Sequence, residues 1–230
     1  MKSISGQSRK EVAKKDQNEQ AYEILKADIV TLRLAPGDFL ITAQLMARYG
    51  LGRTPINHAI HRLADDKLVQ IVPRKGIIVA PLSLDEALDL IAVRMVNEKL
   101  CLQLAAKYIT AQQLKDLKAA QDRYVQASQS NNIVKALDAD RVFHEVLADA
   151  SNNQVLPDVL KRLHARSQRF WALSLDNEHH SREVIEEHNA IIAALEQRDS
   201  EAALAAIERH ILSFHHTFFG AIASPLSAVS

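Results

Sequence analysis

The chain has 230 residues, equal numbers of acidic and basic side chains, and an apolar fraction of 47%. This length accommodates one large domain or two smaller ones with a substantial core. The single cysteine, Cys101, excludes an intramolecular disulfide. Since there is also no signal peptide and no apolar run of about 18 residues, we expect a cytoplasmic protein without membrane segments.

Charge is distributed unevenly along the chain. Residues 1–82 carry 13 Lys and Arg against 8 Asp and Glu, whereas residues 83–230 carry 15 against 20. A basic head on an acidic body is consistent with one end of the protein contacting DNA.

The N-terminal region begins with a polar segment. Residues 1–18 are charged and show little apolar periodicity, so we expect a flexible tail. Apolar residues then follow helical spacing from about Gln20 to Leu34, which predicts a first helix that ends before Pro36–Gly37.

Two short helices separated by a glycine turn are predicted next. Residues 42–49 indicate a helix capped by Thr42 and stopped by Gly50. The following helix has Thr54 as its expected cap and Pro55 at its first position. Ile56, Ile60 and Leu63 form its apolar face, and its other face carries hydrogen-bonding side chains: Arg53, Asn57, His58, His61 and Arg62.

Two β-rich runs, 68–72 and 77–80, flank a basic turn at Pro73–Gly76. Helix, turn, helix and hairpin together predict a winged helix-turn-helix over residues 19–82. An ordinary solvated amphipathic helix is the alternative for the second helix alone. The predicted DNA contacts are Arg48, Arg53, Thr54, Asn57, His58, Arg62, Arg74, Lys75 and Gly76.

Several short motifs in this unit occur together: Ala35–Pro36–Gly37, Leu40, Arg53–Thr54–Pro55 and the wing Gly76. They resemble the DNA-binding domain of the GntR family of bacterial transcription regulators. The usual family run is Ser-Arg-Thr-Pro-Val-Arg-Glu-Ala. Arg53 keeps the first recognition arginine, whereas Asn57 replaces the second and His58 replaces the glutamate. Because Asn prefers adenine edges and Arg prefers guanine, the family's operator preference does not carry over directly.

The remainder of the chain predicts an all-α bundle of about six helices, over residues 83–224, with a short tail at 225–230. Ser83 with Glu86 and Thr110 with Gln113 are expected helix caps. The approximate helix spans are 84–108, 111–128, 131–150, 153–175, 179–197 and 200–222.

The bundle contains a further set of motif residues: Arg94, Glu98, Ala105–Ala106, Asp140–Arg141–Val142–Phe143–His144, Asn153, His188 and His210. They resemble the FCD effector-binding domain that follows the winged domain in one branch of the GntR family. The resemblance implies that an Asp and three His hold a divalent metal inside the bundle.

The spacing of four of these residues is consistent with one site. Asp140 and His144 are four residues apart, so they share one helix face. His188 and His210 lie about eleven residues on either side of the turn near Asp199, which brings them level in an antiparallel hairpin. One carboxylate and three imidazoles suit Zn first, with Ni, Mn or Fe as alternatives. Four separately hydrogen-bonded core or surface residues are the competing interpretation.

Such a metal would keep open positions for a carboxylate, and Arg94 is the predicted carboxylate partner, unless it only pairs with Glu98. Asn153 and Arg166 are weaker effector-binding candidates. No sequence feature ties other histidines, His164, His179 and His180 among them, to the cluster. A solvated helix face is expected for Glu183, Glu186 and Glu187.

Together with the basic winged unit, the resemblance to this family implies a homodimeric regulator that binds a pseudo-palindromic double-stranded DNA operator and senses a small organic or sugar acid. Three alternatives stay open at this point: a sensor of an acyl-CoA-type ligand without metal, a metal-dependent enzyme, and a purely structural metal. The enzyme alternative lacks an acid–base pair, so we expect no catalytic activity.

Overall fold

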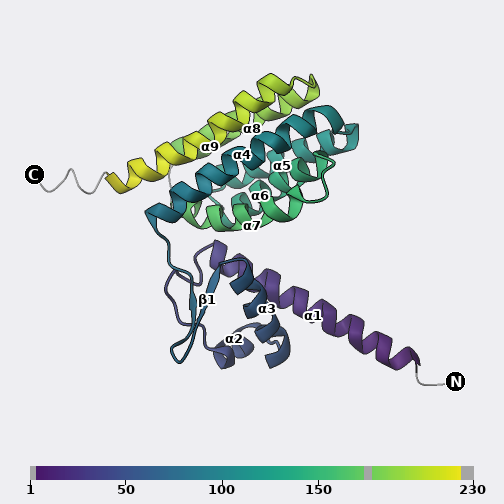
Figure 1. The fold of residues 1–230 in the computed structure, drawn as a ribbon, viewed down its shortest axis with the longest axis vertical. Helices are drawn as coiled ribbons and strands as arrows, with labels where there is room; N and C mark the ends of the chain where they lie inside the picture. The colour runs from purple at the N-terminus through teal and green to yellow at the C-terminus, as the bar shows by residue number, and fades with distance from the viewer. Residues whose placement is uncertain (1–3, 174–177, 224–230) are drawn as a thin grey trace, which may run out of the picture. The chain divides into compact units, whose positions relative to one another are not determined.

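The computed structural model describes residues 4–173 and 178–223 (Figure 1). The chain folds into two compact units, residues 1–82 and residues 83–230. Within the described ranges there are nine helices and one two-stranded sheet, which confirms the predicted class of a winged helix-turn-helix followed by an all-helical domain.

The N-terminal unit packs its first helix against its third. Its elements are α1 (Ile4–Val30), α2 (Thr42–Tyr49), α3 (Arg53–Asp65), β1 (Val69–Val72) and β2 (Gly76–Val79). The apolar faces of α1 and α3 are fully buried and supply the core of the unit, through Leu25, Ile29, Ile56, Ile60 and Leu63. This packing leaves the polar face of α3 exposed.

Several predicted helix starts differ from the structure. α1 begins at Ile4, not near Gln20, because residues 4–18 include three Lys, one Arg and two Gln, which have good helix propensity and show no apolar periodicity. Thr42 and Thr54 do not cap their helices. The capping positions are Ile41 and Gly52, and neither helix has a side-chain cap. Pro55 is tolerated as the third helical residue because the first N–H groups of a helix lack intrahelical acceptors.

β1 and β2 form the antiparallel wing, with Val69 opposite Val79 and Val72 opposite Gly76. Gly76 has a φ of +112°, in the region that favours glycine, so it closes the turn without strain. Phe39 adds an antiparallel bridge to Ile78 and links the wing to the segment before α2.

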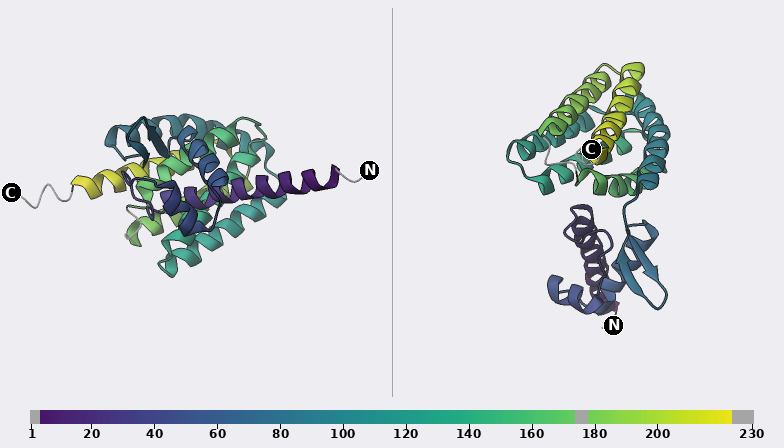
Figure 2. Two further views of the ribbon diagram at one scale, coloured as in Figure 1. Left: turned by 90° about the horizontal axis from the view of Figure 1, so that it is seen from below. Right: turned by 90° about the vertical axis from the view of Figure 1, so that its left-hand side faces the viewer.

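The C-terminal unit is a bundle of helices around a common interior, as the right-hand view of Figure 2 shows. Ser83 caps the first of these helices, and Thr110 with Gln113 forms the capping box of the second. Within Ser83–Glu86 only half of a box forms, since the Glu86 carboxylate pairs with Arg166. The helices are α4 (Leu84–Tyr108), α5 (Ala111–Gln129), α6 (Ile133–Ala150), α7 (Leu156–Trp171), α8 (Glu178–Glu196) and α9 (Ser200–Ala223).

In residues 4–173 and 178–223, no helix combines the length and the apolar character needed to cross a membrane. The predicted tail at 225–230 and the side chain of His179 lie outside the described residues.

Candidate metal centre

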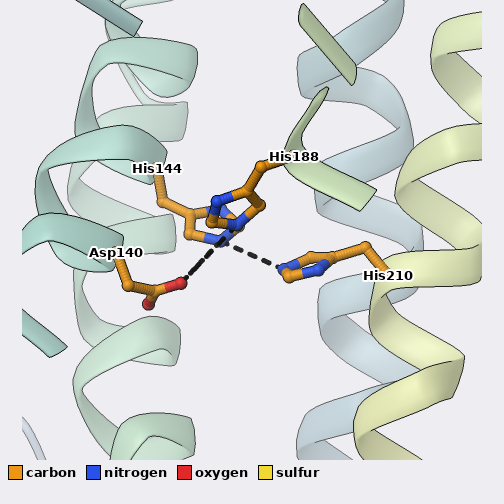
Figure 3. A group of neighbouring side chains, drawn as sticks. All are labelled: Asp140, His144, His188 and His210. Atoms are coloured by element: carbon orange, nitrogen blue, oxygen red, sulfur yellow. Dashed lines mark hydrogen bonds and ion pairs between the residues drawn. The ribbon is translucent and has the colours of Figure 1, made fainter. Parts of the chain in front are cut away.

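Four buried side chains from three helices converge in the interior of the bundle (Figure 3). α6 carries Asp140 and His144 one turn apart, α8 carries His188, and α9 carries His210. Each offers one ligand atom, and the four atoms lie within 4.8 Å of one another. The α8–α9 hairpin brings His188 level with His210, with ring centroids 5.0 Å apart.

The separations of the ligand atoms match a metal polyhedron. The Nε2 atoms of His144 and His188 each lie 3.7 Å from Asp140 Oδ1, and the Nε2 atoms of His144 and His210 are 3.3 Å apart. A metal about 2.1 Å from each ligand in a tetrahedron separates neighbouring ligand atoms by about 3.4 Å. The side chains thus stand at ligand spacing.

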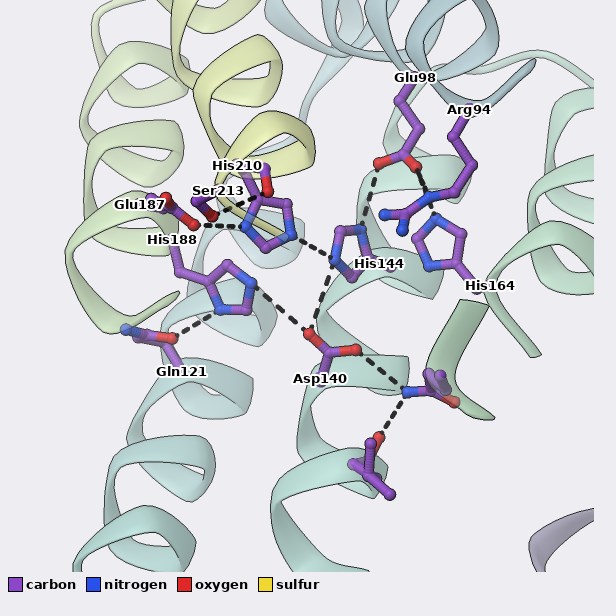
Figure 4. Close-up of polar contacts among 12 residues, drawn as sticks. Arg94, Glu98, Gln121, Asp140, His144, His164, Glu187, His188, His210 and Ser213 are labelled. Atoms are coloured by element: carbon purple, nitrogen blue, oxygen red, sulfur yellow. Dashed lines mark hydrogen bonds and ion pairs between the residues drawn. The ribbon is translucent and has the colours of Figure 1, made fainter. Parts of the chain in front are cut away.

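The outer nitrogen of each imidazole faces an oxygen (Figure 4). His188 Nδ1 lies 3.0 Å from Gln121 Oε1, and His210 Nδ1 lies 2.9 Å from Glu187 Oε2. His144 Nδ1 lies 3.6 Å from Glu98 Oε2. Because amide and carboxylate oxygens accept hydrogen bonds, each Nδ1 carries the proton and each Nε2 presents a lone pair to the common point.

The carboxylate of Asp140 is held in the same way. Gln168 Nε2 donates to Asp140 Oδ2 at 3.0 Å, which leaves Oδ1 directed at the histidines. Within the described residues, neither Asp140 Oδ1 nor His188 Nε2 has a hydrogen-bond partner. Buried polar atoms are costly to leave unpaired, so these two atoms have the chemistry and the position of ligands to a cation.

Burial sets the ionisation of the cluster. Desolvation lowers the pKa of His144 and of His188 well below the usual imidazole range, so both are neutral, as metal ligands must be. Desolvation also raises the pKa of Asp140 to about 6, against the lowering effect of the nearby histidines. In the absence of metal this carboxylate is destabilised as an anion. A divalent ion would reverse that effect.

A second buried group adjoins the first across His144. Arg94 Nε donates to Glu98 Oε1 at 2.6 Å, and His164 Nε2 lies 3.1 Å from the same oxygen. Burial raises the pKa of Glu98, but the charges of Arg94 and His164 outweigh it and hold that pKa well below its usual range. The i,i+4 pairing of Arg94 therefore forms, yet its Nη2 has no partner among the described residues. The Arg94 guanidinium also lies 5.5 Å from the Trp171 ring.

Two expectations about the bundle are wrong. Glu187 is buried against His210, not solvated, because helical periodicity turns it inward while Glu186 stays exposed. His164 does belong with the cluster, since its ring centroid is 4.1 Å from that of His144. α7 delivers it from a segment that spacing along the sequence does not connect to α6.

The weaker effector candidates are engaged elsewhere in the bundle. Asn153 Oδ1 accepts from the backbone N–H groups of Val155 and Leu156, so it closes the turn before α7. Arg166 donates twice to Glu86 Oε1, at 3.1 and 2.9 Å. Of the three predicted effector residues, only Arg94 retains a buried donor without a partner in the described chain.

The predicted DNA-contacting residues fall into two groups in the N-terminal unit. The first group consists of exposed residues on α3 and on the wing: Arg53, Thr54, Asn57, His58, Arg74, Lys75 and Gly76. Arg48 and Arg62 instead contact α1. Arg48 pairs with Asp28 at 3.1 Å. Arg62 pairs with Glu19 at 2.6 Å and stacks 3.8 Å from the centre of the Tyr22 ring.

The residues that sequence reasoning missed are those that hold the ligands in place. Gln121, Gln168 and Glu187 carry no motif, and polar residues at such positions are normally solvated. Two of the three had a signal in the sequence. Gln168 follows His164 by four residues, and Glu187 adjoins His188.

Family models match both units of the chain. Residues 17–79 match the model for bacterial regulatory proteins of the gntR family, and residues 89–213 match the FCD domain. The chain belongs to the GntR family, in its FCD branch. It is a DNA-binding transcription regulator with an FCD effector-binding domain, and the matched relatives are regulators, not enzymes.

Relatives cover most of the chain. The transcriptional repressor RspR of Escherichia coli is 28% identical over 84% of this chain and 85% of its own length. The regulator McbR of the same organism is 25% identical over 84% of this chain and 86% of its own length. The solved structure of E. coli McbR/YncC covers 90% of this chain and 98% of its own, at 22% identity and a TM-score of 0.81. The structure of a GntR regulator from Rhodococcus has a TM-score of 0.75 at 18% identity, and the match covers 90% of this chain and 99% of that one. These structures share the fold.

Proposed function

We propose that this regulator holds a divalent transition metal at Asp140, His144, His188 and His210 and uses it to sense a small organic or sugar acid. The observation that carries the proposal is the anchoring of all four side chains. An oxygen faces the outer nitrogen of each imidazole, Gln168 holds Asp140, and the inner atoms face one point.

Zinc fits this donor set best, with Ni, Mn or Fe as alternatives, because neutral imidazoles with one carboxylate suit these ions better than Ca or Mg. Four protein ligands would leave room for a further donor on a metal that expands its coordination. The metal would act there as a Lewis acid toward an anionic oxygen.

Arg94 would bind the other end of the acid. Its Nη2 is buried and has no partner in the described residues, and a guanidinium matches the geometry of a carboxylate. Glu98 holds Arg94 through Nε, which leaves Nη2 for a ligand. A small acid is favoured over an acyl-CoA-type ligand because a long apolar chain cannot form hydrogen bonds or ion pairs with a cluster of buried charges.

The winged unit would read the operator through α3 and the wing. Arg53, Asn57 and His58 would reach base edges in the major groove, and Arg74 and Lys75 would contact phosphates. Two copies in a homodimer would engage two half-sites of a pseudo-palindromic operator. We place Arg48 and Arg62 in supporting positions, since each already pairs with an acid of α1.

A thermal-shift screen tests the sensor. The purified protein is heated with a panel of small carboxylic and sugar acids, with and without a chelator, beside His188→Ala and Asp140→Asn. We expect one acid to raise the melting temperature only in the metal-loaded wild type, since a ligand of the folded state adds RT ln(1 + [L]/Kd). A chelator effect with no responding acid indicates a structural metal. No response to either overturns the proposal, and turnover of an acid would indicate an enzyme.

A further inference from the structure

Trp171, the last residue of α7, contacts both groups of buried side chains in the bundle. Its ring centroid lies 5.8 Å from that of His210, in a T-shaped arrangement, and 6.5 Å from that of His144. The guanidinium carbon of Arg94 lies 5.5 Å from the centre of the same ring. Trp171 is buried and therefore borders two proposed metal ligands and the proposed carboxylate partner at once.

The sequence of α7 places Trp171 at this point. His164, Gln168 and Trp171 follow one another at spacings of four and three residues, so they share one face of the helix. On that face Gln168 holds the Asp140 carboxylate, and Trp171 reaches Arg94. α7 thus borders the site from a metal ligand to the arginine, and Trp171 lies at the arginine end.

Two contacts fix the direction of the Arg94 guanidinium. Glu98 Oε1 accepts from its Nε at 2.6 Å, and the cation lies over the indole of Trp171. The face of an indole attracts a guanidinium, and this attraction is stronger where water is excluded. The indole that contacts two metal ligands therefore also orients the donor that the acid would meet.

A molecule that joins the metal to Arg94 passes along the Trp171 ring, because that ring contacts both ends of the path. Figure 4 shows Arg94 and His210 on opposite sides of His144. We propose that Trp171 forms the wall of the acid-binding space and sets the largest acid that the regulator accepts. This inference rests on the proposed function and assigns the size limit to one side chain. Because protein interiors are close-packed, a rigid indole would admit a short acid and clash with a longer one.

Ordinary core packing is the competing interpretation of Trp171. The two interpretations differ in the effect of a smaller side chain. A residue that only fills the core would, when replaced by Phe or Leu, lower the melting temperature and weaken the binding of every acid alike. Replacing a wall residue would also lower the melting temperature, but the enlarged space would then favour a longer acid.

Affinities for two series of acids test the size limit: straight-chain carboxylates from acetate to hexanoate and sugar acids from glycerate to gluconate. Each Kd is taken from the dependence of the melting temperature on acid concentration, with Zn in excess. In Trp171→Leu, we expect the longest acid to gain roughly tenfold in affinity relative to the shortest, and less in Trp171→Phe. Leu160→Ala is the matched control, since Leu160 is as buried as Trp171, at 4% exposed, and lies about three turns earlier on α7. It should lower the melting temperature without changing the order of the acids.

Tryptophan fluorescence tests the position of Trp171 without any acid. The chain has a single tryptophan, so its emission reports on this site alone. Ni²⁺ quenches a nearby indole, whereas Zn²⁺, with its filled d shell, does not. We expect Ni²⁺ to quench the emission of the wild type and to leave that of His188→Ala unchanged.

The outcomes separate this inference from the proposed function. Ni²⁺ that binds without quenching, or an unchanged order of acids in both Trp171 variants, would overturn the role of Trp171 and leave the metal-dependent sensor intact. A wild type that no acid of either series stabilises would overturn the proposed sensor, and the size limit with it.

Discussion

The Asp140→Asn variant should be more stable than the wild type without metal and less stable than the wild type with metal. In the metal-free bundle, the Asp140 carboxylate is buried, and its Oδ1 has no hydrogen-bond partner among the described residues. An Asn at this position keeps the acceptor for Gln168 and presents an N–H₂ group to the lone pairs of His144 and His188. The variant therefore satisfies in the apo state what the wild type leaves unpaired.

The magnitude follows from the pKa of Asp140, which burial raises from 3.8 to about 6. Because the pKa of Asp140 is higher in the folded than in the unfolded state, its protonated form stabilises the fold below about pH 4. This stability is lost as the pH rises through 6. The difference of about two pKa units corresponds to about 3 kcal/mol at pH 7. Without metal, Asp140→Asn should gain up to this amount, or roughly 6 to 12 °C in melting temperature.

Metal changes the sign of the comparison. Metal at 1,000 times its Kd stabilises the wild type by about 4 kcal/mol, whereas the variant lacks the charged ligand and gains less. Thermal unfolding at pH 7, with chelator and then with excess Zn, compares the stability of the variant with that of the wild type in both states. Asp138→Asn is the control, since that side chain is 63% exposed on the same helix. Equal destabilisation of Asp140→Asn with and without metal would refute the reasoning.

Three further results are expected. Glu187→Ala should weaken metal binding 10- to 100-fold in a competition titration, because His210 loses the acceptor of its Nδ1–H. Glu186 lies on the exposed side of the same helix, so Glu186→Ala should leave metal binding unchanged. Arg53→Ala should weaken operator binding in a fluorescence titration more than Arg62→Ala, whose guanidinium is already held by α1; equal losses would place both on the DNA. The thiol of Cys101, whose pKa burial raises, should resist iodoacetamide at pH 8 until the protein is unfolded.

The order of the elements follows from local rules that act within a few residues. Glycine and proline residues in the turns marked the limits of α2, α3 and the wing. The caps at Ser83 and Thr110 predicted the starts of two helices in the bundle. The start of α1 was missed because charged residues with good helix propensity leave no periodic signal. The caps predicted for α2 and α3 were wrong, because the N-cap positions are Ile41 and Gly52 and neither helix has a side-chain cap.

The candidate site was predictable only where spacing or motif resemblance reports proximity. Asp140 and His144 are neighbours on one helix, and a hairpin aligns His188 with His210. The meeting of α6 with the α8–α9 hairpin is a tertiary event, and the family resemblance supplied it. The outer groups Gln121 and Gln168 come from α5 and α7, and the spacing of Gln168 from His164 relates it only to its own helix, so no local pattern places either residue beside α6.

The most direct test of the account is operator binding by the metal-loaded protein in the presence of a small acid. Fluorescence anisotropy with the DNA upstream of its own gene gives the affinity with and without the acid that stabilises the protein, before and after chelation. We predict sequence-selective binding whose affinity the acid changes at least fivefold, and only when metal is present. An affinity that neither the acid nor the chelator changes would contradict a metal-dependent sensor.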